Sequence, residues 1–401
     1  MHDKRLPEPL NHLRAAIVAG DAKAISHLLA AFGTGDAVHA ISHLSDAEQS
    51  LLLNLLSSAD AAQLVDDLPE AHAAQMIERL DSAEAAAILS ELPSNEQADV
   101  IGRISELEAS AILEAMPAEE ARDARRLMAY PADSAGGLMI TEYLVYRDHL
   151  TVGDVLDDLR DRAAKYRRYD VQYAYVAAPT GQLVGVLRLR DLLLSVPEEP
   201  LSAVMIREPL SVLDTATLEE MERFFDRHRL YGAPAVDENG VLVGVVRRAD
   251  VKQAAEERST RSFLKYMGIV GGEELRTLPL RVRSMRRLGW LSVNIVLNIM
   301  AASVIAFHQD TLSAVIALAV FLPIISDMSG CSGSQAVAVS MRELDLGFTK
   351  PSEILRVLGK EASVGVINGI VLGLVLGLIG WLWQGNLMLG AIVTASRAVN
   401  T

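Results

Sequence analysis

A run of polar residues interrupts an apolar stretch in the C-terminal third of the chain. Residues 323–335 read PIISDMSGCSGSQ, which places one carboxylate, several hydroxyls and two glycines inside that stretch. Carboxylate and backbone carbonyl oxygens bind hydrated Mg²⁺ through its water shell, and glycines let the backbone deviate or a second helix approach closely. We therefore predict an ion path formed by Pro323, Asp327, Gly330, Cys331, Gly333 and Gln335. The alternative is tight helix packing through small residues.

A membrane-spanning bundle must hold these residues. Residues 288–307 form 20 consecutive positions without a charge, and four arginines stand just before them: Arg281, Arg283, Arg286 and Arg287. Apolar runs at 312–339 and 365–383 predict two more spans, so residues 286–401 should form an α-helical transmembrane bundle with three complete spans. Residues 387–401 read as the opening of a fourth span. The arginines and the basic loop 342–360 place the N-terminal part in the cytoplasm.

The cytoplasmic part is acidic. The 401 residues carry a net charge of −15, and the excess of acidic residues lies before residue 281. This charge argues against nucleic acid as a partner and is compatible with binding divalent cations, although solubility alone would also explain it. Cys331 is the only cysteine, which excludes an internal disulfide and thiolate zinc sites. No nucleophile with a matched base and no phosphate loop occurs, so we expect no enzyme.

The first region contains a repeat of twelve residues. Apolar side chains recur at Leu44, Leu56, Leu68, Leu80, Leu92, Ile104 and Met116, and further apolar positions four residues earlier complete one face of a short helix. Pro69, Pro93 and Pro117 can end one helix and open the next. We predict an all-α solenoid of short helices over residues 1–129. Its polar side gathers carboxylates at Glu91, Glu96, Asp99, Glu106 and Glu108.

The second region contains a longer repeat, with a spacing of 59 residues. GQLVGVLRLRD at 181–191 is echoed by GVLVGVVRRAD at 240–250, each with a turn glycine, a strand, a second glycine and an aspartate placed to cap the next helix. Strands at 171–177 and 233–237 precede the two copies, and helices open near Thr151 and Thr217. This tandem α/β unit resembles a pair of CBS modules, which fold as one regulatory disc and commonly bind adenine nucleotides. The corresponding nucleotide residues would be Arg188, Asp191, Arg247 and Asp250.

A ten-residue segment joins the two regions and makes the resemblance more specific. YPADSAGGLM at 130–139 resembles the signature of MgtE-type magnesium transporters, and so does the order of helical stack, CBS pair, arginine-rich entry and second span. The similarity divides the chain into residues 1–129, a CBS pair at 130–255 (about 138–197 and 202–255), a plug-like connecting helix at 256–285 and an incomplete transmembrane domain at 286–401. It implies a homodimeric Mg²⁺ channel in a prokaryotic inner membrane, multi-pass, with ATP or another adenine nucleotide as a further ligand.

The same resemblance implies a regulatory Mg²⁺ site between the helical stack and the connecting helix. Its ligands would be Glu96, Asp99, Asp250, Glu256 and Glu257. Three departures from the family concern this site and the pore. The connecting helix contains Lys252, Arg258 and Arg261, which repel a divalent ion. Cys331 stands where the family has asparagine, and the family's fifth span with its pore aspartate is not found in this sequence. The alternative function is a membrane-tethered Mg²⁺ or nucleotide sensor that does not conduct.

Overall fold

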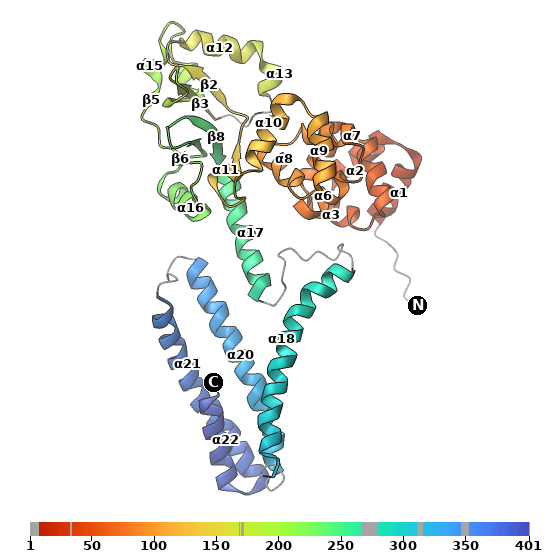
Figure 1. Ribbon diagram of the computed structural model, residues 1–401, viewed down its shortest axis with the longest axis vertical. Coiled ribbons are helices and arrows are strands. Elements are labelled where there is room, and N and C mark those ends of the chain that lie inside the picture. Colours follow the sequence, from red (N-terminus) through yellow and green to blue (C-terminus); the bar gives the residue numbers. More distant parts are fainter. Residues whose placement is uncertain are drawn as a thin grey trace. The chain divides into compact units, whose positions relative to one another are not determined.

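The structure is a computed structural model, and it describes residues 8–32, 34–167, 169, 172–266, 280–310, 316–345 and 353–400 (Figure 1). The chain forms two compact units, which are described here one at a time. The first comprises residues 1–267 with 271–279, and the second comprises 268–270 with 280–401. Arg281, Arg283, Arg286 and Arg287 all lie in the first helix of the second unit, Leu280–Phe307. The connecting helix predicted from the sequence covers residues 256–285, and residues 267–279 of that segment lie outside the described residues.

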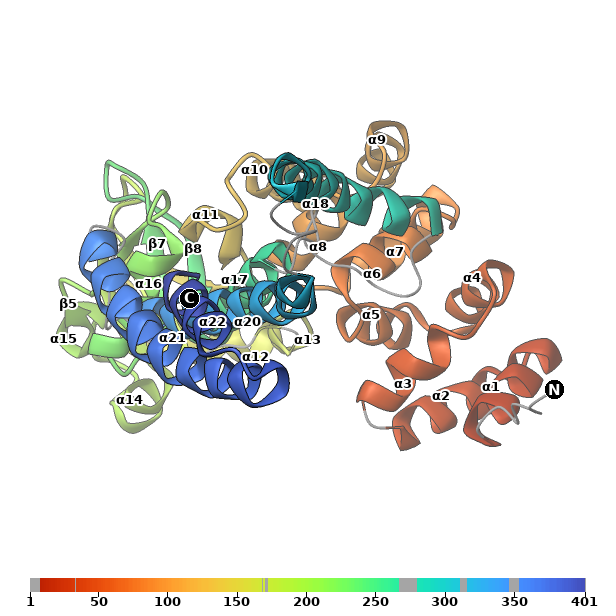
Figure 2. The same ribbon diagram turned by 90° about the horizontal axis from the view of Figure 1, so that it is seen from below.

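The first unit begins with ten short helices, which we call the helical stack. They are α1 (Glu8–Ala19), α2 (Ala22–Ala31), α3 (Thr34–Ile41), α4 (Asp46–Leu55), α5 (Ser58–Asp66), α6 (Glu70–Ile77), α7 (Ser82–Leu89), α8 (Ser94–Ile101), α9 (Glu106–Ala115) and α10 (Ala118–Leu127). From α4 onward a helix begins every 12 residues, which confirms the predicted repeat. Figure 2 shows this series, coloured red to orange, leading from the N-terminus to the sheets.

The helix starts explain the repeat physically. Pro69, Pro93 and Pro117 occupy the N-cap positions of α6, α8 and α10, so each proline opens a helix at a place where no backbone donor is lost. Each helix packs against the next but one: α5 against α7, α7 against α9, α6 against α8 and α8 against α10. The recurring apolar residues form one continuous core. Two rows of helices result, and the assignment of a solenoid stays a prediction.

Two four-stranded sheets follow the helical stack. Their strands are β1 (Met139–Ile140), β2 (Leu144–Arg147), β3 (Tyr173–Ala177), β4 (Leu183–Arg188), β5 (Ile206–Arg207), β6 (Val212–Leu213), β7 (Gly232–Val236) and β8 (Leu242–Arg247). The strand orders are β1-β8-β7-β6 and β2-β3-β4-β5. The helices are α11 (Ala135–Leu138), α12 (Val152–Asp161), α13 (Ala163–Tyr166), α14 (Leu189–Leu194), α15 (Leu201–Val204), α16 (Leu218–Arg227) and α17 (Arg248–Tyr266). Because β1 pairs with β8, the first strand of this region belongs to the sheet of the second repeat copy.

The glycines of the repeat have the expected roles, but the aspartates do not. Gly181 and Gly240 have φ of +88° and +77°, which suits the turn that each was predicted to make. Thr151 and Thr217 cap α12 and α16 with full capping boxes. Asp191 and Asp250 were predicted to be helix caps, and this is wrong. Asp191 and Asp250 lie inside the first turn of α14 and α17, because each helix begins two residues before the aspartate.

The second unit consists of helices. They are α18 (Leu280–Phe307), α20 (Ala317–Asp345), α21 (Ile354–Gln384) and α22 (Leu387–Val399). Within the described ranges two helices are long and apolar enough to cross a membrane, in the segments Arg287–Phe307 and Ile354–Trp383. The prediction of three complete spans is therefore not confirmed. The predicted second span falls on α20, which contains the polar run after Pro323, and residues 312–315 of its predicted apolar run lie outside the described residues.

The last helix packs back along α21. Thr394 of α22 donates hydrogen bonds from Oγ1 to the carbonyl oxygens of Gly373 (3.0 Å) and Gly390 (2.9 Å). Small residues let the two backbones approach closely: a Cβ on Gly377 would lie 2.6 Å from the carbonyl oxygen of Gly390. Such contacts are typical of helix pairs in membranes. The region predicted as the opening of a fourth span is thus a 13-residue apolar helix, Leu387–Val399.

Candidate functional site

The segment YPADSAGGLM forms a tight joint between the helical stack and the second repeat copy. The Tyr130 hydroxyl donates a hydrogen bond to Asp214 Oδ2 at 2.8 Å, and Asp214 is 9% exposed. The Tyr130 ring lies against Gly136, where an added Cβ would come within 2.6 Å of the ring carbon Cε1. Backbone bonds from Gly136 N to the Asp214 carbonyl (2.7 Å) and from Ala135 N to the Ala216 carbonyl (2.8 Å) complete the joint.

Helix α8 is positioned by a second contact. Its N-cap residue, Pro93, makes no side-chain cap hydrogen bond. The segment after β1 supplies one instead: Glu142 Oε2 accepts from the Ser94 backbone N–H at 3.4 Å and from the Ser94 hydroxyl at 2.9 Å. The same hydroxyl accepts from Thr141 N at 2.8 Å. A carboxylate at the N-terminus of a helix is favoured by the helix dipole. Helix α8 is therefore fixed at its start to the polypeptide that enters the sheets.

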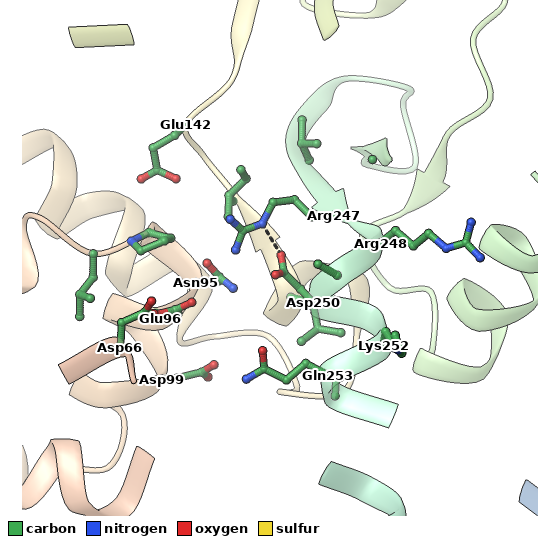
Figure 3. A pocket seen from close by; sticks show the side chains of 18 of the residues that line it. Asp66, Asn95, Glu96, Asp99, Glu142, Arg247, Arg248, Asp250, Lys252 and Gln253 are labelled. Atoms are coloured by element: carbon green, nitrogen blue, oxygen red, sulfur yellow. Dashed lines mark hydrogen bonds and ion pairs between the residues drawn. The ribbon is translucent and has the colours of Figure 1, made fainter. Parts of the chain in front are cut away.

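A pocket of about 1060 Å³ opens beside α8, and we call it the interdomain pocket. Its walls come from α8, from the loop between α5 and α6, and from the end of β8 with the first turns of α17 (Figure 3). Its carboxylates are Asp66, Asp67, Glu70, Glu96, Asp99, Glu142, Asp250 and Glu257, and its basic residues are Arg247, Arg248 and Lys252. The pocket thus carries an excess of negative charge.

Four of the five predicted metal ligands line this pocket. Glu96 and Asp99 lie on α8, and Asp250 and Glu257 lie on α17. Glu256 does not: it is exposed and lies 3.6 Å from the Lys252 ammonium. The sequence-based prediction also missed the lining residues Asp66, Glu70 and Gln253. One signal of two of them is present in the sequence. Asp66 and Glu70 lie on either side of Pro69, which marks a repeat boundary, and Asn95 and Glu96 follow Pro93, which marks a corresponding boundary.

The buried carboxyl groups of the pocket bind protons more tightly than usual. Burial, together with a hydrogen bond and charge repulsion from Asp66, raises the pKa of Glu96 to about 9. Burial and the charges of Glu70 and Glu257 raise the pKa of Asp99 to about 7, against the opposing effect of Arg103. Each shift has the same physical cause, which is negative charge gathered in a place that water reaches poorly. The pocket is therefore a place where added positive charge is favoured.

Asn95 contributes an oxygen that has no partner. The residue is 5% exposed, and its Oδ1 forms no hydrogen bond with any residue that the structure describes. Figure 3 shows its side chain between Glu96 and Asp250. In the part of the chain that the structure describes, no three His, Cys, Asp or Glu side chains converge tightly enough to hold a bare metal ion. The donor set, an amide oxygen among separated carboxylates, instead suits a hydrated cation that is held through its water shell.

The predicted nucleotide residues are not equivalent in the two repeat copies. Arg247 donates from Nε to Asp250 Oδ2 at 2.6 Å and lines the interdomain pocket. Arg188, its counterpart 59 residues earlier, is exposed, and Asp191 pairs with Arg190 at 3.3 Å. The structure therefore brings Arg247 and Asp250 together with the predicted metal ligands, and leaves Arg188 and Asp191 apart from them.

The predicted ion-path residues all lie on α20 and are exposed within the single chain. Pro323, Asp327 and Gly330 share one face because they are spaced by four and three residues. Cys331 and Gly333 flank that face, and Gln335 lies further round the helix. A Cβ on Gly330 or Gly333 would meet nothing within 4 Å. These glycines are therefore not used for close packing inside the described chain.

Successive parts of this chain are similar to known protein families. Three family models match: "MgtE intracellular N domain" at residues 33–133, "CBS domain" at 201–257 and "Divalent cation transporter" at 322–401. The magnesium transporter MgtE of Bacillus subtilis (strain 168) is 33% identical over 271 residues, which cover 67% of this chain and 59% of the relative. Its counterpart in Thermus thermophilus is 31% identical over 278 residues, covering 68% and 60%.

A solved structure agrees with the fold of the first unit. It is the cytosolic domain of the Mg²⁺ channel MgtE in complex with ATP, with a TM-score of 0.56 and 28% identity, covering 61% of this chain and 99% of that chain. The chain spans about 60% of the length of the curated relatives it matches.

Proposed function

We propose that this chain, which belongs to the MgtE family, carries Mg²⁺ across a membrane under the control of its cytosolic domains. The observation that carries this proposal is the face of α20 that bears Asp327 and Gly330, within the segment matched by the divalent cation transporter model. An acidic side chain inside a membrane is stable where it faces water or another protein surface, and so is helix backbone that glycines leave uncovered.

The ion path would form between α20 and a second surface. Among the described residues, none covers Gly330 or Gly333, and Asp327 is exposed. A second copy of the chain, related by a twofold axis, would place two such faces opposite each other and enclose a polar passage. Mg²⁺ keeps several of its waters when it is bound, so the Asp327 carboxylate and nearby carbonyl groups would hold the hydrated ion. This is the basis for proposing a homodimer in the inner membrane.

The regulatory part of the proposal rests on the interdomain pocket. Asn95, Glu96, Asp99, Asp250 and Glu257 would hold a hydrated Mg²⁺. Its positive charge would offset the charges of Asp66, Glu70 and Glu257, which together with burial raise the pKa values of Glu96 and Asp99. Because these residues lie on both α8 and α17, a bound Mg²⁺ would link the two helices. The cytosolic Mg²⁺ concentration would thereby control the position of the helical stack. An adenine nucleotide is proposed as a second ligand of the CBS pair, by similarity to the ATP complex.

Uptake of Mg²⁺ into proteoliposomes tests the transport proposal. The 401-residue chain should take up Mg²⁺, and Asp327→Ala should reduce the rate at least tenfold, since removal of a charged ligand costs roughly 1.5–3 kcal/mol. Asp310→Ala, which removes a carboxylate three residues beyond the end of α18, is the matched control and should transport normally. Equal rates for Asp327→Ala and the unmodified chain would refute the ion path. No uptake by a folded, inserted chain would contradict transport and favour the non-conducting sensor.

A further inference from the structure

Helix α22 carries one charged residue, Arg397, and places it in the interior of the second unit. The side chain is 1% exposed and is one of the largest fully buried side chains among the described residues. A guanidinium keeps its proton at any physiological pH, so this charge is permanent. A charged side chain inside a membrane is costly, and residues of this kind mark ion pathways and their control. Arg397 is therefore a candidate for a role in the passage of ions.

Two observations place the stem of Arg397 against α21. Thr394, three residues earlier on α22, donates from Oγ1 to the carbonyl oxygen of Gly373 at 3.0 Å. A Cβ added to Gly373 would lie 3.4 Å from the Cβ of Arg397. Figure 1 shows α22 running back along α21, as these contacts require. The side chain of Arg397 thus begins against the backbone of α21.

The neighbours of Arg397 on the same face of α22 contact α20. Val393, four residues earlier, is buried in a cluster with Phe321 and Ile325. Asn400, three residues later, donates from Nδ2 to the carbonyl oxygen of Ile325 at 3.2 Å. Residues three and four apart lie on one face of a helix. Arg397 is therefore enclosed between α21 and the side of α20 that bears Ile325.

The proposed ion path runs along the other side of α20. Ile325 packs toward α22, whereas Asp327 is exposed, and two residues correspond to a turn of about 200° around a helix. The Asp327 carboxylate therefore lies across the width of α20 from Arg397, a separation of about 10–12 Å. Packed protein fills most of this distance, so the charge of Arg397 is screened less than it would be in water.

We infer that Arg397 is a fixed positive charge behind the ion path, which weakens the binding of a cation at Asp327 and so speeds its release. A conducting site must bind an ion well enough to admit it and weakly enough to let it leave. At about 10–12 Å and an effective dielectric constant of about 20–40, one positive charge would lower the affinity for a divalent ion by roughly 10- to 100-fold. The inference rests on the proposed function only in taking Asp327 as a cation ligand.

The thiol of Cys331 can report the electrostatic potential beside Asp327. Cys331 is the only cysteine of the chain, it is exposed, and it lies one turn beyond Asp327 on α20. Two methanethiosulfonate reagents of similar size, one anionic and one cationic, modify a thiol at rates whose ratio depends on the local potential. This ratio is measured on the full chain in detergent and chelator. Arg397→Gln keeps hydrogen-bonding groups and loses the charge, so it should lower the anionic-to-cationic ratio by roughly three- to tenfold.

Three further variants separate charge from packing. Arg397→Lys keeps the charge and should keep the ratio, whereas Arg397→Met should lower it as Arg397→Gln does. Arg356→Met is the matched control: it removes an arginine that is 74% exposed in the first turn of α21, and it should leave the ratio unchanged. If the ratio stays the same in Arg397→Gln, or falls equally in Arg397→Lys or Arg356→Met, the inference is wrong.

Protection of Cys331 by Mg²⁺ distinguishes this inference from the proposed function. Mg²⁺ bound at Asp327 should slow modification of the thiol, and Arg397→Gln should lower the half-protecting Mg²⁺ concentration by roughly tenfold or more. Equal half-protecting concentrations in the two chains would refute the inference and leave the Asp327 site intact. If the reagent ratio falls in Arg397→Gln but Mg²⁺ protects neither chain, the positive charge behind the path is supported, whereas Asp327 as a Mg²⁺ ligand is contradicted.

Discussion

Replacing Gly136 with alanine tests the physical basis of the joint in YPADSAGGLM. A Cβ at this position would overlap the Tyr130 ring, with only 2.6 Å to Cε1. The ring cannot swing away freely, because its hydroxyl is bonded to the largely buried Asp214. Overpacking costs about 1–3 kcal/mol, and a lost hydrogen bond to a charged group costs about 1.5–3 kcal/mol. We expect Gly136→Ala to destabilise the first unit by about 2–5 kcal/mol.

Thermal unfolding of the full chain in detergent measures this effect. For a unit of this size, 1 kcal/mol shifts the midpoint by about 2–4 °C, so Gly136→Ala should lower the transition of the first unit by about 4–20 °C. The decisive comparison is a double-mutant cycle with Tyr130→Ala. Once the ring is absent, Gly136→Ala should cost less than about 1 kcal/mol. An equal cost in both backgrounds would show that the ring contact is not the reason for glycine at this position.

Two more substitutions probe the pocket and the membrane unit. Asp99→Asn should stabilise the chain in chelator by about 1–3 kcal/mol at about pH 8, because a carboxyl whose pKa is raised by folding is destabilising once it is ionised in both states. It should also weaken the rise in thermal midpoint that Mg²⁺ produces, and a lower midpoint in chelator would contradict the reasoning. Gly377→Ala should speed hydrogen exchange in α22, because the added Cβ would press on Thr394 and the Gly390 carbonyl. Gly359→Ala is the control and should have little effect, because no described atom lies within 4 Å of a Cβ at that position.

The helical stack could be predicted from the sequence because its information is local. A spacing of twelve residues with apolar positions four apart fixes the length and the buried face of each helix, and helices α4–α10 begin at that interval. The same holds for the turn glycines Gly181 and Gly240, since their positive φ is a property of one residue. The cap positions were less certain, because a helix can start on either side of an aspartate such as Asp250.

The pocket could be predicted only in part because its walls come from distant segments. Glu96 and Asp99 followed from the resemblance, but Asp66 joins them through packing between neighbouring repeats. Arg188 and Arg247 have the same spacing to an aspartate and were given one role. Their surroundings differ because Arg247 lines the interdomain pocket, whereas Arg188 is exposed. Asp191 also has Arg190 beside it, where the second copy has Ala249. For α20, the apolar flanks indicated a span and the polar run suggested the ion path, but residues 312–315 of the first flank lie outside the described residues.

Helix α17 links the pocket to the rest of the second repeat copy, and its contacts limit which part can move. Helix α17 begins in the pocket wall and continues for 19 residues, a length of about 28 Å. Arg258, beyond the pocket, contacts Glu219 at 3.3 Å and Glu222 at 3.0 Å on α16. Helix α17 is therefore held to the second repeat copy in two places: at Arg258, and at its start, where it continues directly from β8. A change of charge in the pocket would accordingly displace the helical stack before it displaces α17, because the stack is joined through the 130–139 segment and the contacts of α8 and α10.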